Sequence, residues 1–273
     1  MIDVQNQQDH RRIAINKVGV RDIRFPITVL DRENREQQTI AMISMSVDLA
    51  HAFKGTHMSR FIEVLNAHAG VFTMHTLPSL LDELRSKLRA QTAHIELTFP
   101  YFVTRHAPVT GASALMDYEC KFEGARGNCE HDFVVTVTVP VTSLCPCSKA
   151  ISDYGAHNQR GKITISIRTH EDANGPRLVW IEELIAIAES AASAPVYPLV
   201  KRADERHITM QAYDRPAFVE DMVRDVAVQL QRDDRAKWFS ITAVNDESIH
   251  NHSAFAHIES SNTAEEVALR ATR

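Results

Sequence analysis

Apolar and polar side chains alternate along several stretches of the chain, a pattern typical of β-strands that bury one face. Near the amino terminus, Ile23–Leu30 and Thr39–Leu49 show this alternation on either side of the charged residues 31–36, which predicts a hairpin. His94–Val103 and Leu115–Phe122 predict two further strands. Apolar residues at helical spacing lie between the two pairs. The helices predicted there are Ser59–Ala69 and Pro78–Arg89.

The same order of elements begins again after the turn-forming residues 124–132. Phe133–Val141 and Lys162–Arg168 alternate cleanly and predict two strands. Two stretches with helical spacing follow, and two short alternating stretches close the series. These last elements are the helices Ile181–Ala192 and Phe218–Leu230 and the strands Trp238–Val244 and Ser248–His257.

Two successive ββααββ series predict an α+β protein with antiparallel sheets and an internal structural duplication. We expect the first unit over residues 21–128 and the second over residues 129–258, with a polar lead at 1–20 and a polar tail at 259–273. Helices grouped between strand pairs cover only one face of each sheet, so the other face needs a partner. A homo-oligomer is therefore expected.

The composition is that of an ordinary globular protein, with 44% hydrophobic and 24% charged residues among 273. It excludes the disordered, collagen-like and coiled-coil classes. A net charge of -5 lacks the basic footprint of a nucleic-acid-binding protein. The amino terminus is polar, and no apolar run approaches the roughly 20 residues that span a bilayer. We expect a cytoplasmic protein with neither a membrane nor a nucleic acid as partner.

The segment Ser143–Gly161, between two predicted strands, carries the strongest chemical signal. Cys145 and Cys147 are separated by one proline, and His157 follows. A bridge between cysteines this close would be strained, and four cysteines are too few for a disulfide scaffold, so thiols are expected. Thiols and imidazole could hold a transition metal and leave one sulfur as a nucleophile; the alternative is two small buried side chains. That alternative is favoured for Cys120 and Cys129.

The segment ESIHNHSAF contains two histidines two positions apart on a predicted strand, so that His250 and His252 are expected on the same face. Paired imidazoles suit metal ligation, acid–base chemistry near neutral pH or contact with phosphate. Glu247 lies just upstream. The alternative interpretation is a strand face exposed to solvent.

Two carboxylates and one basic segment are candidate site residues only in combination with other residues. Glu205 lies in KRADERH, and Glu220 lies early in the last long predicted helix, where an acidic residue commonly stabilises the helix terminus. A predicted helix, whose amino end attracts anions, is preceded by Lys54, His57 and Arg60. This arrangement suggests phosphate as a ligand. A basic helix entry on the surface is an equal alternative.

Four segments resemble the type IB GTP cyclohydrolases, prokaryotic enzymes that open folate synthesis. The segments are SLCPCSKAISDYGAHNQRG, KGTHMSRF, FVEDMVRDVA and ESIHNHSAF, which together reach from Lys54 to Phe255. The resemblance implies tandem tunnelling-fold units of ββααββ order, assembled as a homotetrameric barrel with sites between subunits. It also implies that GTP and water become 7,8-dihydroneopterin triphosphate and formate. The implied cofactor is a divalent metal: zinc, manganese or iron.

The resemblance also assigns roles to residues. Cys145, with His157 and Glu205, would hold the metal, although His250 or His252 could take a place in that set. Cys147 would be the essential active-site cysteine. The remaining assignments are Glu220 as the guanine anchor, Glu247, His250 and His252 as catalytic residues lining the pocket, and Lys54, His57 and Arg60, with Lys149 or Arg202, as triphosphate contacts.

Two alternatives compete with the cyclohydrolase. One is the nitrile-reducing branch of the same fold, which uses a cysteine nucleophile on a deazaguanine and takes hydride from NADPH. A CPC pair with an HNH segment favours metal-dependent hydrolysis over this branch. The other is a noncatalytic assembly module whose metal would be fully coordinated by protein.

Overall fold

The structure, a computed structural model, describes residues 5, 7–68, 70–127, 131–173 and 175–262. These residues form two compact units. The N-terminal unit contains the residues up to 100 together with 121–135, and the C-terminal unit contains 101–120 and the residues from 136 onward. The chain passes between the units within three long strands, β3 (Ala93–His106), β4 (Ser113–Arg126) and β5 (His131–Leu144).

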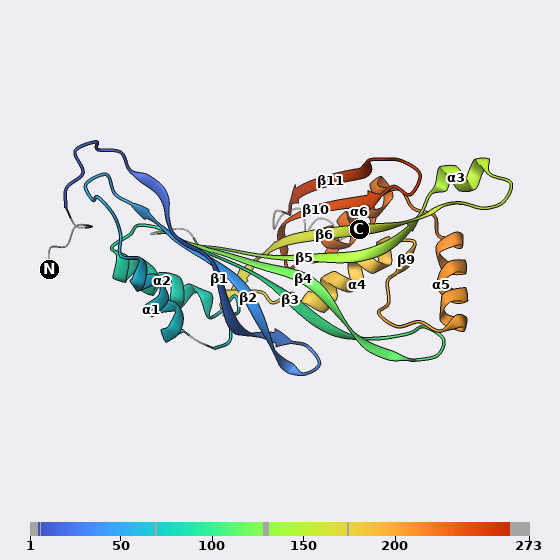
Figure 1. The fold of residues 1–273 in the computed structure, drawn as a ribbon, viewed down its shortest axis with the longest axis horizontal. Helices are drawn as coiled ribbons and strands as arrows, with labels where there is room; N and C mark the ends of the chain where they lie inside the picture. The colour runs from blue at the N-terminus through green and yellow to red at the C-terminus, as the bar shows by residue number, and fades with distance from the viewer. Residues whose placement is uncertain (1–4, 6, 69, 128–130, 174, 263–273) are drawn as a thin grey trace. The chain divides into compact units, whose positions relative to one another are not determined.

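The N-terminal unit is built on a hairpin of β1 (Ile15–Asp31) and β2 (Arg35–Leu49), as predicted (Figure 1). The Asp31 carboxylate accepts the backbone N–H groups of Glu33 and Asn34 at 2.9 and 2.7 Å, which fixes the turn. β2 pairs antiparallel with β3. β1 begins at Ile15, earlier than predicted, and none of the residues in this additional part is buried.

The two predicted helices of this unit are α1 (Met58–Ala67) and α2 (Leu77–Leu88). They pack against each other, α1 also contacts β1, and α2 contacts β2. Gly124 of β4 admits α2, because a Cβ there would lie 3.1 Å from Ile95 and 3.2 Å from Leu81. Position 69, the predicted end of the first helix, lies outside the described residues. The buried helix side chains are Phe61, Val64, Leu65, Leu77, Leu80, Leu81 and Leu84.

The sheet of the C-terminal unit follows the order β5, β6 (Asn158–Thr169), β10 (Ala236–Asp246) and β11 (Ser253–Ser261) (Figure 1). β10 pairs antiparallel with both of its neighbours. β9 (Ala194–Pro195) adds to β5. A separate small ribbon consists of β7 (Glu171–Asp172) and β8 (Gly175–Pro176).

Two helices of this unit, α4 (Ile181–Ala191) and α6 (Val219–Arg232), pack against the main strands of the sheet. α6 packs on β10, β11 and α4. The spacing of apolar residues every three or four positions predicts its buried stripe except at Phe218, which precedes the helix and is exposed. The stripe consists of Val219, Met222, Val223, Val226 and Leu230. None of the helices in the described residues is long and apolar enough to cross a membrane.

The α+β class with antiparallel strands is confirmed, but three local predictions are wrong. α5 (Arg202–Asp214) gave no helical signal because only Asp204 and Ala212 are buried in it. α3 (Pro146–Ile151) interrupts the segment expected to be a loop, because Pro146 suits the first turn of a helix. β11 begins five positions later than predicted, so residues 248–252 form a loop rather than a strand.

Candidate active site

The CPC loop, residues 145–157, is closed on itself at its base. The Cys145 N–H donates to the His157 carbonyl at 3.3 Å. The two residues predicted to share a metal therefore lie opposite each other at the base of the loop. Ser148 reinforces this closure from inside. Its N–H donates to Cys145 Sγ at 3.5 Å, and its Oγ accepts the His157 N–H at 3.2 Å.

The cysteines of the described residues are free thiols, as predicted, and differ in exposure. Cys147, on α3, is exposed, whereas Cys145 is half-buried at the helix amino end. Cys120 is fully buried, which raises the pKa of its thiol well above the usual range. This fits the structural role expected of it, while Cys129 lies outside the described residues. Among the described cysteines, only those of the CPC loop therefore present a thiol to solvent.

The segment that carries Glu247, His250 and His252 lies against the CPC loop. Ser248 Oγ is 2.9 Å from His157 Nδ1, and Gln159 Nε2 donates to Glu247 Oε1 at 3.0 Å. Although the two histidines lie in a loop and not on a strand, their rings stack with centroids 5.0 Å apart and planes 15° apart. The predicted pairing is thus present, and the predicted strand geometry is not its cause.

Glu220 is held next to the CPC loop through the backbone. The Ala217 N–H donates to the carbonyl of Leu144, the last residue of β5, at 3.2 Å. Asp221 accepts the Phe218 N–H at 3.0 Å and fixes the start of α6. Glu220 follows in the first turn with its side chain exposed. The segments bearing Cys145 and Glu220 therefore begin side by side.

Glu205 is fixed by its buried neighbour Asp204. The Asp204 carboxylate accepts the N–H groups of Val109, Thr110 and Lys201, each at 2.9 Å, and the Thr110 hydroxyl at 2.6 Å. Burial opposes ionisation here, but these hydrogen bonds prevail and hold the pKa of Asp204 below its usual range. Glu205 itself is exposed on the first turn of α5.

The opposite end of α5 is the end that contacts the CPC loop. Lys149 Nζ donates to the Tyr213 carbonyl and lies 4.2 Å from the centre of the Tyr213 ring. Tyr213 lies about 12 Å farther along the helix axis than Glu205 at the α-helical rise. Within one chain, Glu205 is thus not brought beside Cys145.

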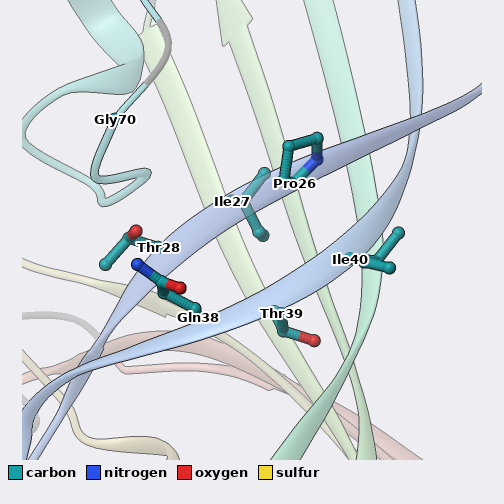
Figure 2. Close-up of a pocket in the computed structure, with 7 residues that line it drawn as sticks. All are labelled: Pro26, Ile27, Thr28, Gln38, Thr39, Ile40 and Gly70. Carbon is teal, nitrogen blue, oxygen red and sulfur yellow. The ribbon is translucent and has the colours of Figure 1, made fainter.

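The three predicted phosphate contacts lie in the N-terminal unit. Lys54 is exposed, and His57 is the residue that precedes α1. Arg60 Nη1 donates to the Lys87 carbonyl at 2.8 Å, near the end of α2. The same unit has an open pocket of about 430 Å³ between β1, β2 and Gly70. Figure 2 shows its seven lining residues, which include none of the predicted site residues.

The donors of the CPC loop fit a divalent transition metal. Thiolate and imidazole together suit zinc or iron, and an added carboxylate extends the range to manganese. Ser248 engages His157 Nδ1, so Nε2 is the ring nitrogen that would be available to a metal, as is usual for metal-binding histidine. Among the described residues of one chain, no three His, Cys, Asp or Glu side chains are close enough to hold the ion.

Solved structures of uricases share the fold of this chain. The uricase from Bacillus fastidious matches with a TM-score of 0.59 at 10% identity, covering 95% of this chain and 96% of that one. The uricase from Arthrobacter globiformis matches with a TM-score of 0.53 at 9% identity, covering 90% and 93%. Identities this low concern the fold alone. They place the chain among proteins of the tunnelling fold.

Sequence relatives narrow this class to one family. The model of the type I GTP cyclohydrolase FolE2 family matches residues 1–256, and the chain belongs to that family. The GTP cyclohydrolase FolE2 of Syntrophus aciditrophicus is 51% identical over 259 residues, covering 95% of this chain and 99% of the relative. That of Magnetococcus marinus is 53% identical over 258 residues, covering 94% and 95%.

Proposed function

We propose that this protein hydrolyses GTP to 7,8-dihydroneopterin triphosphate and formate, the first step of folate synthesis, in the cytoplasm. One observation carries the proposal: Cys145, His157 and the start of the Glu220 helix are held on a single hydrogen-bonded frame. Relatives about half identical over nearly the whole chain are named GTP cyclohydrolase FolE2. The narrower type IB assignment stays a prediction from the resemblance of the four segments.

Glu220 is suited to select guanine. It makes no hydrogen bond or ion pair within the described part of the chain, so its carboxylate oxygens are available to a ligand. A carboxylate accepts two hydrogen bonds, from the ring N–H and the exocyclic amine of guanine. Adenine lacks this pair of donors and would leave the acceptors unpaired. Guanine is therefore the base that this side chain favours.

Cys145 and His157 would hold the divalent metal, with Glu205 or one of His250 and His252 as the third ligand. The cation would supply Lewis acidity, lowering the pKa of water so that hydrolysis at carbon 8 runs near neutral pH. Cys147, which is exposed and two residues from Cys145, would move a proton at the opening imidazole ring. Imidazole nitrogens can both donate and accept a proton, so the stacked pair suits proton transfer during formate release.

The site is proposed to be completed between copies of the chain in a homotetramer of tandem ββααββ units. α3 contacts the end of α5 remote from Glu205, which leaves this carboxylate to another subunit. β1 and β11 are the outermost strands of the sheet among the described residues, and such edges favour pairing with a second copy. Lys54, His57 and Arg60, with Lys149 or Arg202, would bind the triphosphate; Arg60 and Lys149 each already donate one hydrogen bond to a backbone carbonyl.

Incubation of the purified protein with GTP and Mn²⁺, Zn²⁺ or Fe²⁺ tests the proposal. Release of formate and a pterin that fluoresces after oxidation supports the cyclohydrolase. If the protein binds metal but forms no product with Mn²⁺, with Zn²⁺ or with Fe²⁺, a noncatalytic module would be favoured. Oxidation of NADPH in the presence of a deazapurine nitrile would favour the nitrile-reducing branch.

A further inference from the structure

Buried polar residues lie beneath the site at the ends of β5 and β10. Along each strand the buried face is apolar until a polar residue takes the last position, Ser143 after Val141 and Asn245 after Ala243. Ser143 is 0% exposed and Asn245 is 2% exposed. Each lies two positions before a predicted site residue, Cys145 or Glu247. Apolar side chains would continue the core at lower cost, because a buried polar group needs partners.

Ser143 connects three segments of the C-terminal unit. Asn245 Nδ2 donates to Ser143 Oγ at 3.1 Å, and Ser143 Oγ donates to the Ala217 carbonyl at 2.8 Å. Ala217 lies three residues before Glu220. The next residue of β5, Leu144, donates its N–H to the fully buried Ser193 Oγ at 3.0 Å. The segments leading to Cys145, Glu220 and Glu247 are thus tied to one another by side chains that solvent does not reach.

Gly161 of β6 keeps Asn245 in place. The two residues are directly opposite in the antiparallel register, and a Cβ at Gly161 would lie 2.4 Å from Asn245 Oδ1. A side chain here would force Asn245 to shift. The absence of a Cβ on β6 therefore creates the space in which Asn245 reaches Ser143.

We propose that Ser143 and Asn245 are positioning residues. Their hydrogen bonds fix the distance between the guanine anchor Glu220 and the CPC loop, and they hold the Glu247 loop in the same arrangement. The proposal rests on the proposed function of this site. Low-dielectric surroundings strengthen hydrogen bonds and make unpaired groups costly, so the linked pair has one favoured arrangement. Catalysis depends on such arrangements, because a displacement of about 1 Å can cost about a hundredfold in rate.

The test compares Ser143→Ala, Asn245→Ala and the double variant in the full-length, metal-loaded protein. Asn262→Ala is the matched control, because Asn262 is equally buried, at 2% exposure, and donates to the Leu230 carbonyl at 3.2 Å. Leu230 lies about 15 Å along α6 from Glu220 at the α-helical rise, away from the site. The control therefore loses a similar hydrogen bond without loosening the site segments.

We expect Ser143→Ala to lower kcat/KM for GTP by about tenfold or more, mostly through a higher KM, because one lost buried hydrogen bond frees the Glu220 helix start. The double variant should be no worse than the poorer single variant, as expected of residues that act as one unit. Asn262→Ala should lower the melting temperature but keep kcat/KM within about twofold.

Two outcomes would overturn the proposal. One is a kcat/KM of Ser143→Ala equal to that of the Asn262→Ala control at a similar melting temperature. The other is a double variant whose losses simply multiply. Ser143→Ala removes a single oxygen and keeps the test valid even where Asn245→Ala fails to fold. A wild-type protein without turnover would instead remove the proposed function itself, which separates the two failures.

Discussion

At the residue scale, substitutions of Cys147 and Cys120 are expected to have opposite effects on turnover and stability. Cys147 is exposed and Cys120 fully buried, so truncation should separate chemistry from packing. Cys147→Ala should abolish pterin formation and leave the melting temperature unchanged. Cys120→Ala should retain kcat but lose about 1–3 kcal/mol of unfolding free energy, because it empties volume in the core. Pterin fluorescence and thermal melts measure both; retained turnover in Cys147→Ala would remove the role given to this thiol.

Glu220 permits a second residue-scale prediction, which concerns recognition. Glu220→Gln keeps the shape of the side chain but turns one acceptor into a donor, opposite the donors of guanine. Hydrogen bonds to charged groups contribute enough that KM for GTP should rise by about tenfold to a hundredfold. Asp225, a second exposed carboxylate on the same helix, supplies the control: Asp225→Asn should leave KM unchanged. Steady-state kinetics decide, and equal KM values in the two variants would exclude Glu220 as the anchor.

At the scale of elements, α5 depends on a buried carboxylate. Because the hydrogen bonds hold the folded-state pKa of Asp204 below its usual 3.8, ionised Asp204 stabilises the fold at all pH values above 3.8. This contribution is lost as the pH falls below 3.8 toward the lowered folded-state value. Asp204→Asn should therefore lower the urea midpoint by a constant amount between about pH 8 and pH 5, and by less at about pH 3. A difference independent of pH throughout would contradict this role.

The elements that could be predicted from the sequence are those whose pattern reflects one buried face. The stripe of α6 and the alternation of β6 are clear because their apolar side chains pack on one side only. α5 was missed because its main anchors are a buried aspartate and one alanine. Residues 248–252 were mistaken for a strand because Ser248, Ile249 and His250 alternate in polarity by chance, although Ile249 is 66% exposed.

Some residues of the candidate site could be predicted from the sequence, whereas others become evident only from their burial in the structure. Cys145, Cys147 and His157 could be found because thiols and imidazole in one short segment are uncommon. Ser143 and Asn245 could not, because serine and asparagine are ordinary in a sequence until their burial is known. The usable signal was a polar residue at the last position of an otherwise apolar alternation, Val137, Val139, Val141 and then Ser143.

At the scale of the whole molecule, a site shared between subunits can be tested by complementation. Cys145 and His157 are bound to each other through the backbone of one loop, whereas Glu205 lies at the end of α5 that this loop does not contact. If Glu205 is a ligand supplied by another copy, Cys145→Ala and Glu205→Ala chains damage different halves of a site. Mixed oligomers then contain sites with one intact half from each variant.

The two inactive variants are mixed in equal amounts, unfolded and refolded together. In a statistical mixture of a symmetric oligomer, about a quarter of the sites receive both intact halves. The mixture should therefore recover about a quarter of the wild-type turnover. A mixture of Cys145→Ala with His157→Ala is the control and should remain inactive, because both residues belong to the same loop of the same chain. The amount of pterin formed, with oligomer size from light scattering, gives the answer. An inactive Cys145→Ala and Glu205→Ala mixture of full oligomeric size would place both residues in one chain or exclude Glu205 as a ligand. Recovered activity would show that a single copy holds only half of each site, and assembly would then be part of catalysis, because a lone subunit could not complete the metal centre.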